Sequence, residues 1–270
     1  MTQYKLLVVD VDGTLVGRTG NISPENREAI RKVRRAGIRI SLCTGRVPKA
    51  CERYVRELNL DGYHIFCDGA LASSPDGDVV YIRPIRPEVI REAVEFTYEN
   101  GIYLELYSAT RFFIREETWA TKLRREFFGL EPTMADLREL WNLEKIIKAQ
   151  LMLSTEEERA QAEKFRARFK DDFNFSYAKI PSHPNVDFIN LIHPEASKGV
   201  ALRALVTHLD VSLEEVVAVG DGRNDIPLLT LAGLAIAMDN APDDLKAIAD
   251  YVTLDVDQNG LAAAVDKVLL

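Results

Sequence analysis

Cysteine is scarce in this sequence of 270 residues. It has only Cys43, Cys51 and Cys67, and no two of them stand in a CxxC arrangement. An odd set without paired spacing favours neither a disulfide framework nor a zinc site. We therefore expect reduced, mostly buried thiols, since free cysteine is among the most buried residue types.

Long apolar runs are also missing. The segment LAGLAIAM (residues 231–238) is among the longest, and it falls far short of the roughly 18 residues that a membrane span needs. The N-terminal run does not fit a signal peptide, because Asp10 and Asp12 interrupt it directly after LLVV. The sequence predicts a cytoplasmic protein that does not contact a membrane.

Positive charge is in deficit, with 34 Lys and Arg against 42 Asp and Glu, a formal net charge of −8. An acidic surface disfavours nucleic acids and anionic membranes, so an anionic substrate would need a local positive site. The chain is 47% hydrophobic and 28% charged, which is ordinary for a globular protein and excludes collagen-like or disordered chains. Its length leaves both one large domain and two smaller ones open.

The first 84 residues alternate between apolar runs and helical segments. The runs YKLLVVDVDGT, IRISLC (38–43) and YHIFC (63–67) predict strands, the first of them buried on both faces. Between them we expect a helix that Ser23 caps and Gly37 ends, with Pro24 at its first position, and a second helix over about 48–59. This β-α-β-α-β order predicts a parallel, doubly wound sheet with right-handed crossovers.

Residues 85–188 differ in composition, because they hold ten of the eleven Phe and both Trp. We expect helices over 87–100, 116–128 and 135–141, and strands over 102–107, 111–114, 146–153, 174–178 and 186–192. The run Ser154-Thr155-Glu156-Glu157 predicts a capping box that opens a further helix to about Lys170. Alternation over 173–177 favours antiparallel pairing. These residues predict a separate α+β unit with an aromatic core.

The βα rhythm resumes at Ser197. We expect a helix over 197–209, a capping box at Ser212–Glu215, strands over 216–220, 234–238 and 251–253, a helix opened by Pro242 and a terminal helix over 260–269. The simplest architecture is a Rossmann-like α/β core, residues 1–84 and 189–270, interrupted by an inserted α+β cap domain, residues 85–188.

Four short polar segments follow predicted strands or open a helix, and together they suggest chemistry. They are Asp10-Val11-Asp12-Gly13-Thr14, Thr44-Gly45-Arg46, Ser197-Lys198-Gly199 and Gly220-Asp221-Gly222-Arg223-Asn224-Asp225. Ligands of doubly wound sheets bind beyond the carboxyl ends of the strands. A hydroxyl with backbone N–H groups cradles an anion, and a lysine at a helix N-terminus adds positive potential. Asp10, Asp221 and Asp225 would form the oxygen-rich shell that suits Mg²⁺.

Taken singly, each segment also has an ordinary interpretation. The first could be an acidic turn, the second a common turn and the third a surface lysine. An EF-hand is disfavoured because glycine comes fourth in the first segment and Asn21 stands where the loop needs glutamate. The combination of all four is far more specific than any one of them.

The sequence resembles the haloacid dehalogenase-like (HAD) superfamily, specifically its Cof-like branch (subfamily IIB) of sugar-phosphate phosphatases. The matching motifs are DVDGTLV (10–16), TGR (44–46), SKGVAL (197–202) and GDGRNDIPLL (220–229), with weaker matches at DGA (68–70), AIAMDNA (235–241) and ADYVT (249–253). They run along the whole chain. The long gap between TGR and SKG has the length expected for the large cap of that branch.

The resemblance implies a mechanism and a set of site residues. Asp10 would be the nucleophile that forms an aspartyl-phosphate, and Asp12 the general acid and base. The phosphoryl oxygens would be held by Val11, Thr44, Gly45, Lys198 and Asn224. The cofactor would be Mg²⁺, with Asp10, the backbone carbonyl of Asp12, Asp221 and Asp225 as its ligands. The substrate would be a small phosphorylated metabolite, and the chain a monomer or a homodimer.

Three further residues are candidate substrate contacts: Arg46, Asp68 and His183. Asp68 stands where this branch commonly carries Asn, and its charge would repel a phosphate unless it is protonated, ion-paired with Arg46 or turned away. His183 lies with Asn185 and Asp187 in PSHPNVD, where a surface loop is the plainer interpretation.

Three alternatives to a phosphatase remain. A phosphosugar mutase would use the same nucleophile and acid. A receiver-like module phosphorylated on one Asp is disfavoured, because such modules are about half this length and carry no inserted domain. A catalytically silent scaffold is disfavoured because every expected catalytic residue type is present.

Overall fold

The computed structural model describes residues 4–180 and 183–269. The chain forms two compact units. The core unit comprises Met1–Gly45, Glu52–Tyr81 and Ser197–Leu270, and the cap unit comprises Arg46–Cys51 and Ile82–Ala196. The main part of the cap unit thus begins before residue 85 and ends after residue 188. The cap unit also includes the short segment Arg46–Cys51, which begins at the last residue of TGR. The domain limits of the functional protein stay a prediction.

The core unit contains the parallel sheet that the apolar runs predict. Its strands lie in the order β14-β13-β12-β1-β2, and all of their pairings are parallel. These strands are β1 (Leu6–Val9), β2 (Arg39–Leu42), β12 (Val216–Gly220), β13 (Leu234–Ala237) and β14 (Tyr251–Val252). Every residue of β1 and β12 is buried, as expected of strands covered on both faces. The predicted α/β class is confirmed.

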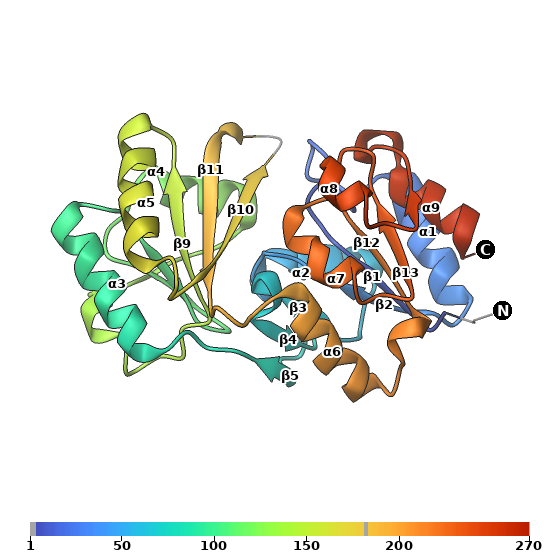
Figure 1. Cartoon of the computed structure of the whole chain (residues 1–270), viewed down its shortest axis with the longest axis horizontal. Helices are drawn as coiled ribbons and strands as arrows, with labels where there is room; N and C mark the ends of the chain where they lie inside the picture. The colour runs from blue at the N-terminus through green and yellow to red at the C-terminus, as the bar shows by residue number, and fades with distance from the viewer. Residues whose placement is uncertain (1–3, 181–182, 270) are drawn as a thin grey trace. The chain divides into compact units, whose positions relative to one another are not determined.

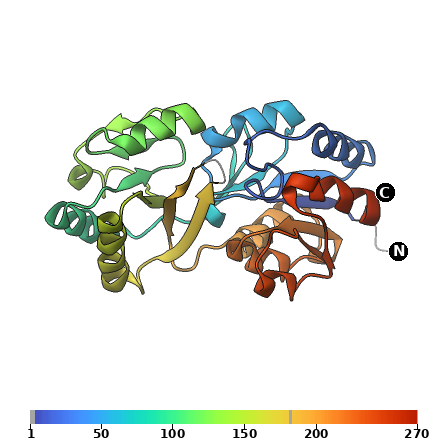
Figure 2. The ribbon, with the colours of Figure 1, turned by 90° about the horizontal axis from the view of Figure 1, so that it is seen from above.

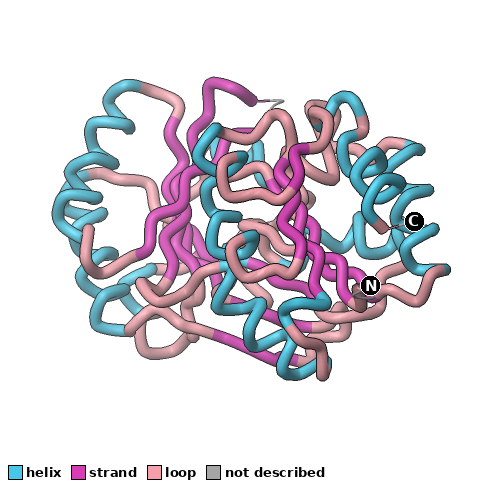
Figure 3. Tube along the Cα trace, turned by 45° about the vertical axis from the view of Figure 1, so that its right-hand side comes forward, coloured by secondary structure: helices cyan, strands magenta, loops and turns pink. Residues whose placement is uncertain are grey.

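Helices lie on both sides of this sheet (Figures 1 and 3). On one side are α1 (Pro24–Arg35) and α9 (Gly260–Val268), and on the other α6 (Lys198–Leu209) and α7 (Ile226–Leu229). Ser23 caps α1 as predicted, because its side chain accepts a hydrogen bond from the Asn26 N–H. Helix α6 buries Ala201, Leu202 and Leu205 in the core beneath it. Two further helices are α2 (Pro48–Leu58) and α8 (Asp243–Lys246).

A small second sheet extends the core unit beyond β2. It contains β3 (His64–Phe66), β4 (Leu71–Ser73) and β5 (Val79–Ile82), of which the sequence predicted only the first. One parallel bridge joins Cys43 to Ile65, so β3 lies beside the end of β2, but β3 pairs antiparallel with β4 and is not a strand of the parallel sheet, as the sequence had predicted it to be. The strands β4 and β5 were missed because LAS is only three residues long and turn-forming Ser, Pro, Asp and Gly residues follow it.

The cap unit is built on a six-stranded sheet in the order β10-β11-β9-β6-β7-β8. The strands are β6 (Glu105–Tyr107), β7 (Phe112–Ile114), β8 (Thr133–Met134), β9 (Lys148–Leu153), β10 (Asn174–Ile180) and β11 (His183–Ile192). The β10–β11 pair is antiparallel, as the alternation predicted. Figures 1 and 2 show α3 (Pro87–Asn100) and α5 (Glu156–Phe169) together on one face of this sheet, over an aromatic core that includes Phe165 and Phe169.

Three predictions for the cap unit are wrong in detail. The helix expected over 116–128 is α4 (Trp119–Leu123) continued by a π-helix, Arg124–Phe128. The helix expected over 135–141 is a single 3₁₀ turn, Leu137–Glu139. The capping box of α5 is made by Thr155 and Glu158, because the chain is still extended at Thr155 and turns helical one residue later than predicted. Among the described residues no helix is both long enough and apolar enough to cross a bilayer.

Candidate active site

The polar segments after β1 and β12 lie at the same edge of the core sheet. Val9 is paired with Val219, and the Asp10 N–H donates to the Val219 carbonyl at 3.0 Å. Asp10 therefore lies beside the segment that begins at Gly220. Strand β2 ends at the same edge, where the Cys43 N–H donates to the Val9 carbonyl at 2.9 Å, and Thr44 follows directly.

Lys198 brings two distant aspartates together. It is the first residue of α6, whose N-cap Ser197 accepts from the Val200 N–H, and its side chain is buried. The Nζ atom lies 2.5 Å from Asp10 Oδ1 and 2.6 Å from Asp225 Oδ1. Burial by itself lowers the Lys198 pKa, but the charges of Asp10 and Asp225 outweigh burial. The pKa is therefore raised well above its ordinary value, and the ammonium stays charged.

A third carboxylate, that of Asp221, lies close to the two that contact Lys198. Oxygen atoms of Asp10, Asp221 and Asp225 all lie within 4.8 Å of one another. The second oxygen of Asp225 accepts from the N–H groups of Asp221 at 3.0 Å and Gly222 at 2.9 Å. Burial raises the pKa of Asp10 well above its usual range, and burial with the Asp225 charge raises the pKa of Asp221 to about 7.

This donor set tests the predicted Mg²⁺ site. The charges are unbalanced, because three clustered carboxylates, two of them buried, lie at one buried ammonium in the described part of the chain, and all three offer oxygen ligands. Mg²⁺ prefers such hard oxygen ligands, and a divalent ion would compensate the excess negative charge. The residues present therefore fit the ion.

Two glycines allow the carboxylates to approach the backbone so closely. Gly13 has φ +89°, and a Cβ atom there would overlap the Asp221 carboxylate. At Gly220 a Cβ atom would lie 2.5 Å from Asp225 Cγ. Only glycine has both the conformational freedom and the space that position 13 requires.

Two residues that sequence reasoning missed hold the Asp221 carboxylate. Thr14 Oγ1 donates to Asp221 Oδ1 at 2.9 Å, and Asn240 Nδ2 donates to Asp221 Oδ2 at 3.2 Å. Asn240 is itself fixed, because its Oδ1 accepts from the Val256 N–H at 3.0 Å. Both stand inside matching motifs, DVDGT and AIAMDNA, so their positions could have signalled a role.

Hydrogen bonds connect Thr44, Asp68 and Asn224. The Thr44 carbonyl accepts from the Asp68 N–H at 3.0 Å. Asp68 is buried, and its Oδ1 accepts from Asn224 Nδ2 at 2.7 Å. Thr44 and Asn224, both predicted to bind phosphate, are thus linked through Asp68, which stands where the Cof-like branch commonly carries Asn.

The remaining predicted residues have the following positions. Val11 is buried, and Asp12 and Gly45 are half-buried in the core unit. Arg46 belongs to the cap unit, where its guanidinium carbon lies 5.1 Å from the centre of the Phe128 ring. His183 is half-buried at the start of β11. The roles of these five residues stay predictions.

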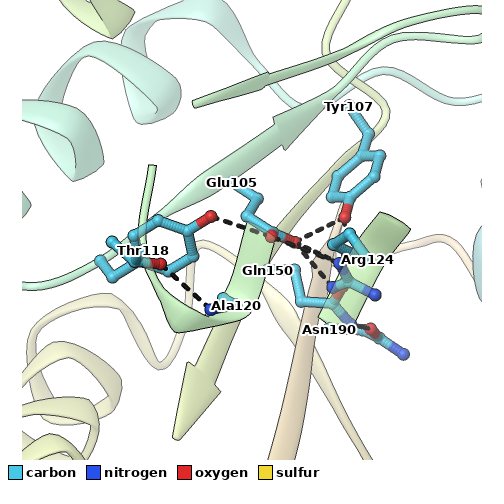
Figure 4. Close-up of polar contacts among 8 residues, drawn as sticks. Glu105, Tyr107, Thr118, Ala120, Arg124, Gln150 and Asn190 are labelled. Atoms are coloured by element: carbon cyan, nitrogen blue, oxygen red, sulfur yellow. Dashed lines mark hydrogen bonds and ion pairs between the residues drawn. The ribbon is translucent and has the colours of Figure 1, made fainter. Parts of the chain in front are cut away.

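The cap unit also contains a buried polar network that sequence reasoning did not predict (Figure 4). Arg124 Nη2 lies 2.6 Å from Glu105 Oε2, which also accepts from the Tyr107 hydroxyl at 2.5 Å. Gln150 accepts from Arg124 and donates to Asn190. The network fixes the π-helix to the sheet. The amino-acid pattern offers little indication of this network, since strand β9 contains two polar residues, Lys148 and Gln150, and is otherwise apolar.

The chain resembles known hydrolases and phosphatases over nearly its whole length. The profile of the haloacid dehalogenase-like hydrolases matches residues 7–265. Phosphatase YwpJ of Bacillus subtilis is 29% identical over 96% of this chain and 97% of its own length. The chloroplastic endoribonuclease YBEY of Arabidopsis thaliana is 26% identical over 97% of this chain, which spans only 46% of that protein.

Solved structures share the fold. A haloacid dehalogenase-like hydrolase from Bacteroides thetaiotaomicron superimposes with a TM-score of 0.84 at 25% identity and covers 98% of this chain and 100% of its own. A HAD subclass IIB sugar phosphatase, BT4131, superimposes with a TM-score of 0.80 at 24% identity. The match covers 97% of this chain and 98% of that one.

The core fold, its carboxylate site and the named phosphatase relative define a phosphoric monoester hydrolase. The chain belongs to the haloacid dehalogenase-like hydrolase superfamily, as the motifs predicted.

Proposed function

We propose that this protein is a Mg²⁺-dependent phosphatase that hydrolyses a small phosphorylated metabolite through an aspartyl-phosphate. The contact between Asp10 and Lys198, at 2.5 Å and beside Asp221 and Asp225, carries this proposal. An anionic nucleophile can approach an anionic phosphate only where fixed positive charge offsets their repulsion, and Lys198 supplies such charge.

The reaction has two steps. A carboxylate oxygen of Asp10 attacks phosphorus, the bond from phosphorus to the leaving oxygen breaks, and Asp12 gives that oxygen a proton. Asp12 then takes a proton from water, whose oxygen attacks the same phosphorus. The bond from phosphorus to Asp10 breaks, so inorganic phosphate is released and the Asp10 carboxylate is restored.

The other residues bind the transferring phosphoryl group and the metal. Thr44, the backbone N–H groups of Val11 and Gly45, Lys198 and Asn224 would hold its oxygens. The side chains of Asp10, Asp221 and Asp225 and the carbonyl of Asp12 would hold Mg²⁺, which when bound neutralises negative charge on the phosphoryl group. Thr14 and Asn240 orient Asp221 for this task.

A sugar phosphate or a similar metabolite is the proposed substrate. The sugar phosphatase that shares the fold supports this class. We also propose a cytoplasmic location, with which the three buried free thiols agree.

Phosphate release from a panel of phosphorylated sugars, nucleotides and small acids tests the proposal. Hydrolysis should require Mg²⁺ and disappear with EDTA. Asp10→Asn should fold and lose turnover, while Asp239→Asn, which changes an exposed aspartate two residues after β13, should retain it. Hydrolysis by Asp10→Asn, or hydrolysis that EDTA does not affect, would contradict the mechanism.

A further inference from the structure

Asp68 lies in an unusual backbone segment. Cys67, Asp68 and Gly69 all have positive φ, at +52°, +52° and +95°. Such angles are unfavourable for Cys67, whereas Asp is one of the few side chains that tolerates them. Strained backbone of this kind persists only where the surrounding structure imposes it, and it is concentrated at functional sites.

The surrounding structure does impose it. A Cβ atom at Gly69 would overlap the Ser197 carbonyl, so this turn packs directly against the start of α6 that carries Lys198. The Asp68 N–H is fixed by the Thr44 carbonyl at 3.0 Å. The turn therefore holds the Asp68 side chain at a set place among residues of the proposed phosphate site.

One partner of the buried Asp68 carboxylate is an asparagine, whose amide has two alternative orientations. Asn224 Nδ2 donates to Asp68 Oδ1 at 2.7 Å. An asparagine amide can turn to present either its oxygen or its nitrogen. An ionised carboxylate only accepts hydrogen bonds, so the orientation that points Asn224 Oδ1 at Asp68 would be repulsive. The second N–H of Asn224 is then the donor left for another partner.

We propose that Asp68 is a positioning residue that fixes the Asn224 amide so that it presents an N–H donor to the phosphoryl group. The inference rests on the proposed function, because that function assigns Asn224 to phosphate binding. Asp68 lies close enough to the buried Lys198 ammonium to act on it electrostatically. Asp68 needs neither to exchange a proton nor to touch the substrate for this role.

A double-mutant cycle in kcat/KM tests the proposal. Asp68→Gly removes the carboxylate without backbone strain, since glycine accepts φ +52°. Loss of a hydrogen bond to a charged group should lower kcat/KM by about 10-fold to 100-fold. Asn224→Ala should cost as much or more. The double variant should then be no worse than Asn224→Ala alone, because Asp68 acts through Asn224.

Asp68→Asn separates positioning from charge. Asparagine tolerates the same φ and can still accept from Asn224 Nδ2, but its own amide can also present an N–H, so it selects the Asn224 orientation less strictly. The value of kcat/KM should therefore fall by less than in Asp68→Gly, and its pH profile should not move. Asp78→Asn is the matched control, because Asp78 also accepts a hydrogen bond, from the Tyr63 hydroxyl at 2.6 Å, at an exposed position in the core unit. That control should leave kcat/KM unchanged.

Three results would overturn the proposal. They are additive losses in the double variant, an Asp68→Asn variant as impaired as Asp68→Gly, and a shifted pH profile in Asp68→Asn. Failure of the proposed function looks different, because the wild type would then release no phosphate from any substrate. In that case the cycle is measured as binding of inorganic phosphate with Mg²⁺ by calorimetry, and an equal Kd for wild type and Asp68→Gly would refute the positioning role.

Discussion

Replacing Lys198 by methionine should destabilise the metal-free protein more than the loss of any surface ion pair. The Nζ atom lies 2.5 Å from Asp10 and 2.6 Å from Asp225, and its side chain is fully buried. Methionine fills much of the same volume, so packing changes little, but Asp10 and Asp225 lose the ammonium that pairs with them. Removing one partner of a buried ion pair costs about 3–5 kcal/mol, because the remaining charge is left without compensation in a poorly solvated site.

Urea unfolding in EDTA at neutral pH measures this loss. Lys246→Met is the matched control, since Lys246 forms a partly exposed pair with Asp239 at 3.0 Å and should cost about 1 kcal/mol or less. Added Mg²⁺ should restore part of the stability of Lys198→Met, because the ion binds the uncompensated carboxylates. Equal losses in the two variants, or no effect of Mg²⁺ on Lys198→Met, would refute the charge balance described for the site.

Three further outcomes follow from the structure. Because the Asp221 pKa is about 7 in the folded chain against 3.8 ordinarily, metal-free stability should fall by at most about 4 kcal/mol as pH rises from about 4 to 7, and Asp221→Asn should abolish that part. Burial lowers the His64 pKa from 6.5 to about 4, so the contribution of His64 to the pH dependence of stability has the opposite sign. Stability should fall by about 3 kcal/mol as pH drops through this range, and His64→Phe should not show that fall. Both variants are compared with wild type by urea unfolding at each pH. Gly13→Ala should weaken Mg²⁺ binding and cost clearly more stability than Gly77→Ala, which has φ +90° but open space around its Cβ, and equal melting temperatures would contradict the close approach to Asp221.

Much of the core fold could be predicted from the sequence because its signals are local. The four residues of β1 are all apolar and buried, so neighbouring charges mark where the strand ends. Ser23 and Pro24 define the start of α1 by capping chemistry alone. The π-helix that begins at Arg124 could not be predicted this way, since its geometry depends on a long-range ion pair with Glu105.

The candidate site shows the same division. Asp10, Asp221 and Asp225 could be placed together because parallel strands bring their carboxyl ends to one edge. The hydrogen bond from Asn224 to Asp68 joins residues far apart in the chain, and no spacing rule anticipates it. Sequence reasoning recognised that Asp68 departs from the branch pattern, but only the fold identifies its partner.

The central claim is that Asp10 accepts the phosphoryl group. Asp12→Asn lacks the proposed general base, so the intermediate should persist long enough to be trapped with acid. After incubation with acetyl phosphate and Mg²⁺, mass spectrometry should find one added phosphoryl group on the tryptic peptide Leu6–Arg18, and none in EDTA or in the variant that also carries Asp10→Asn. Phosphorylation that persists without Asp10, or efficient turnover with no trapped phosphoryl group under any quench, would contradict the account.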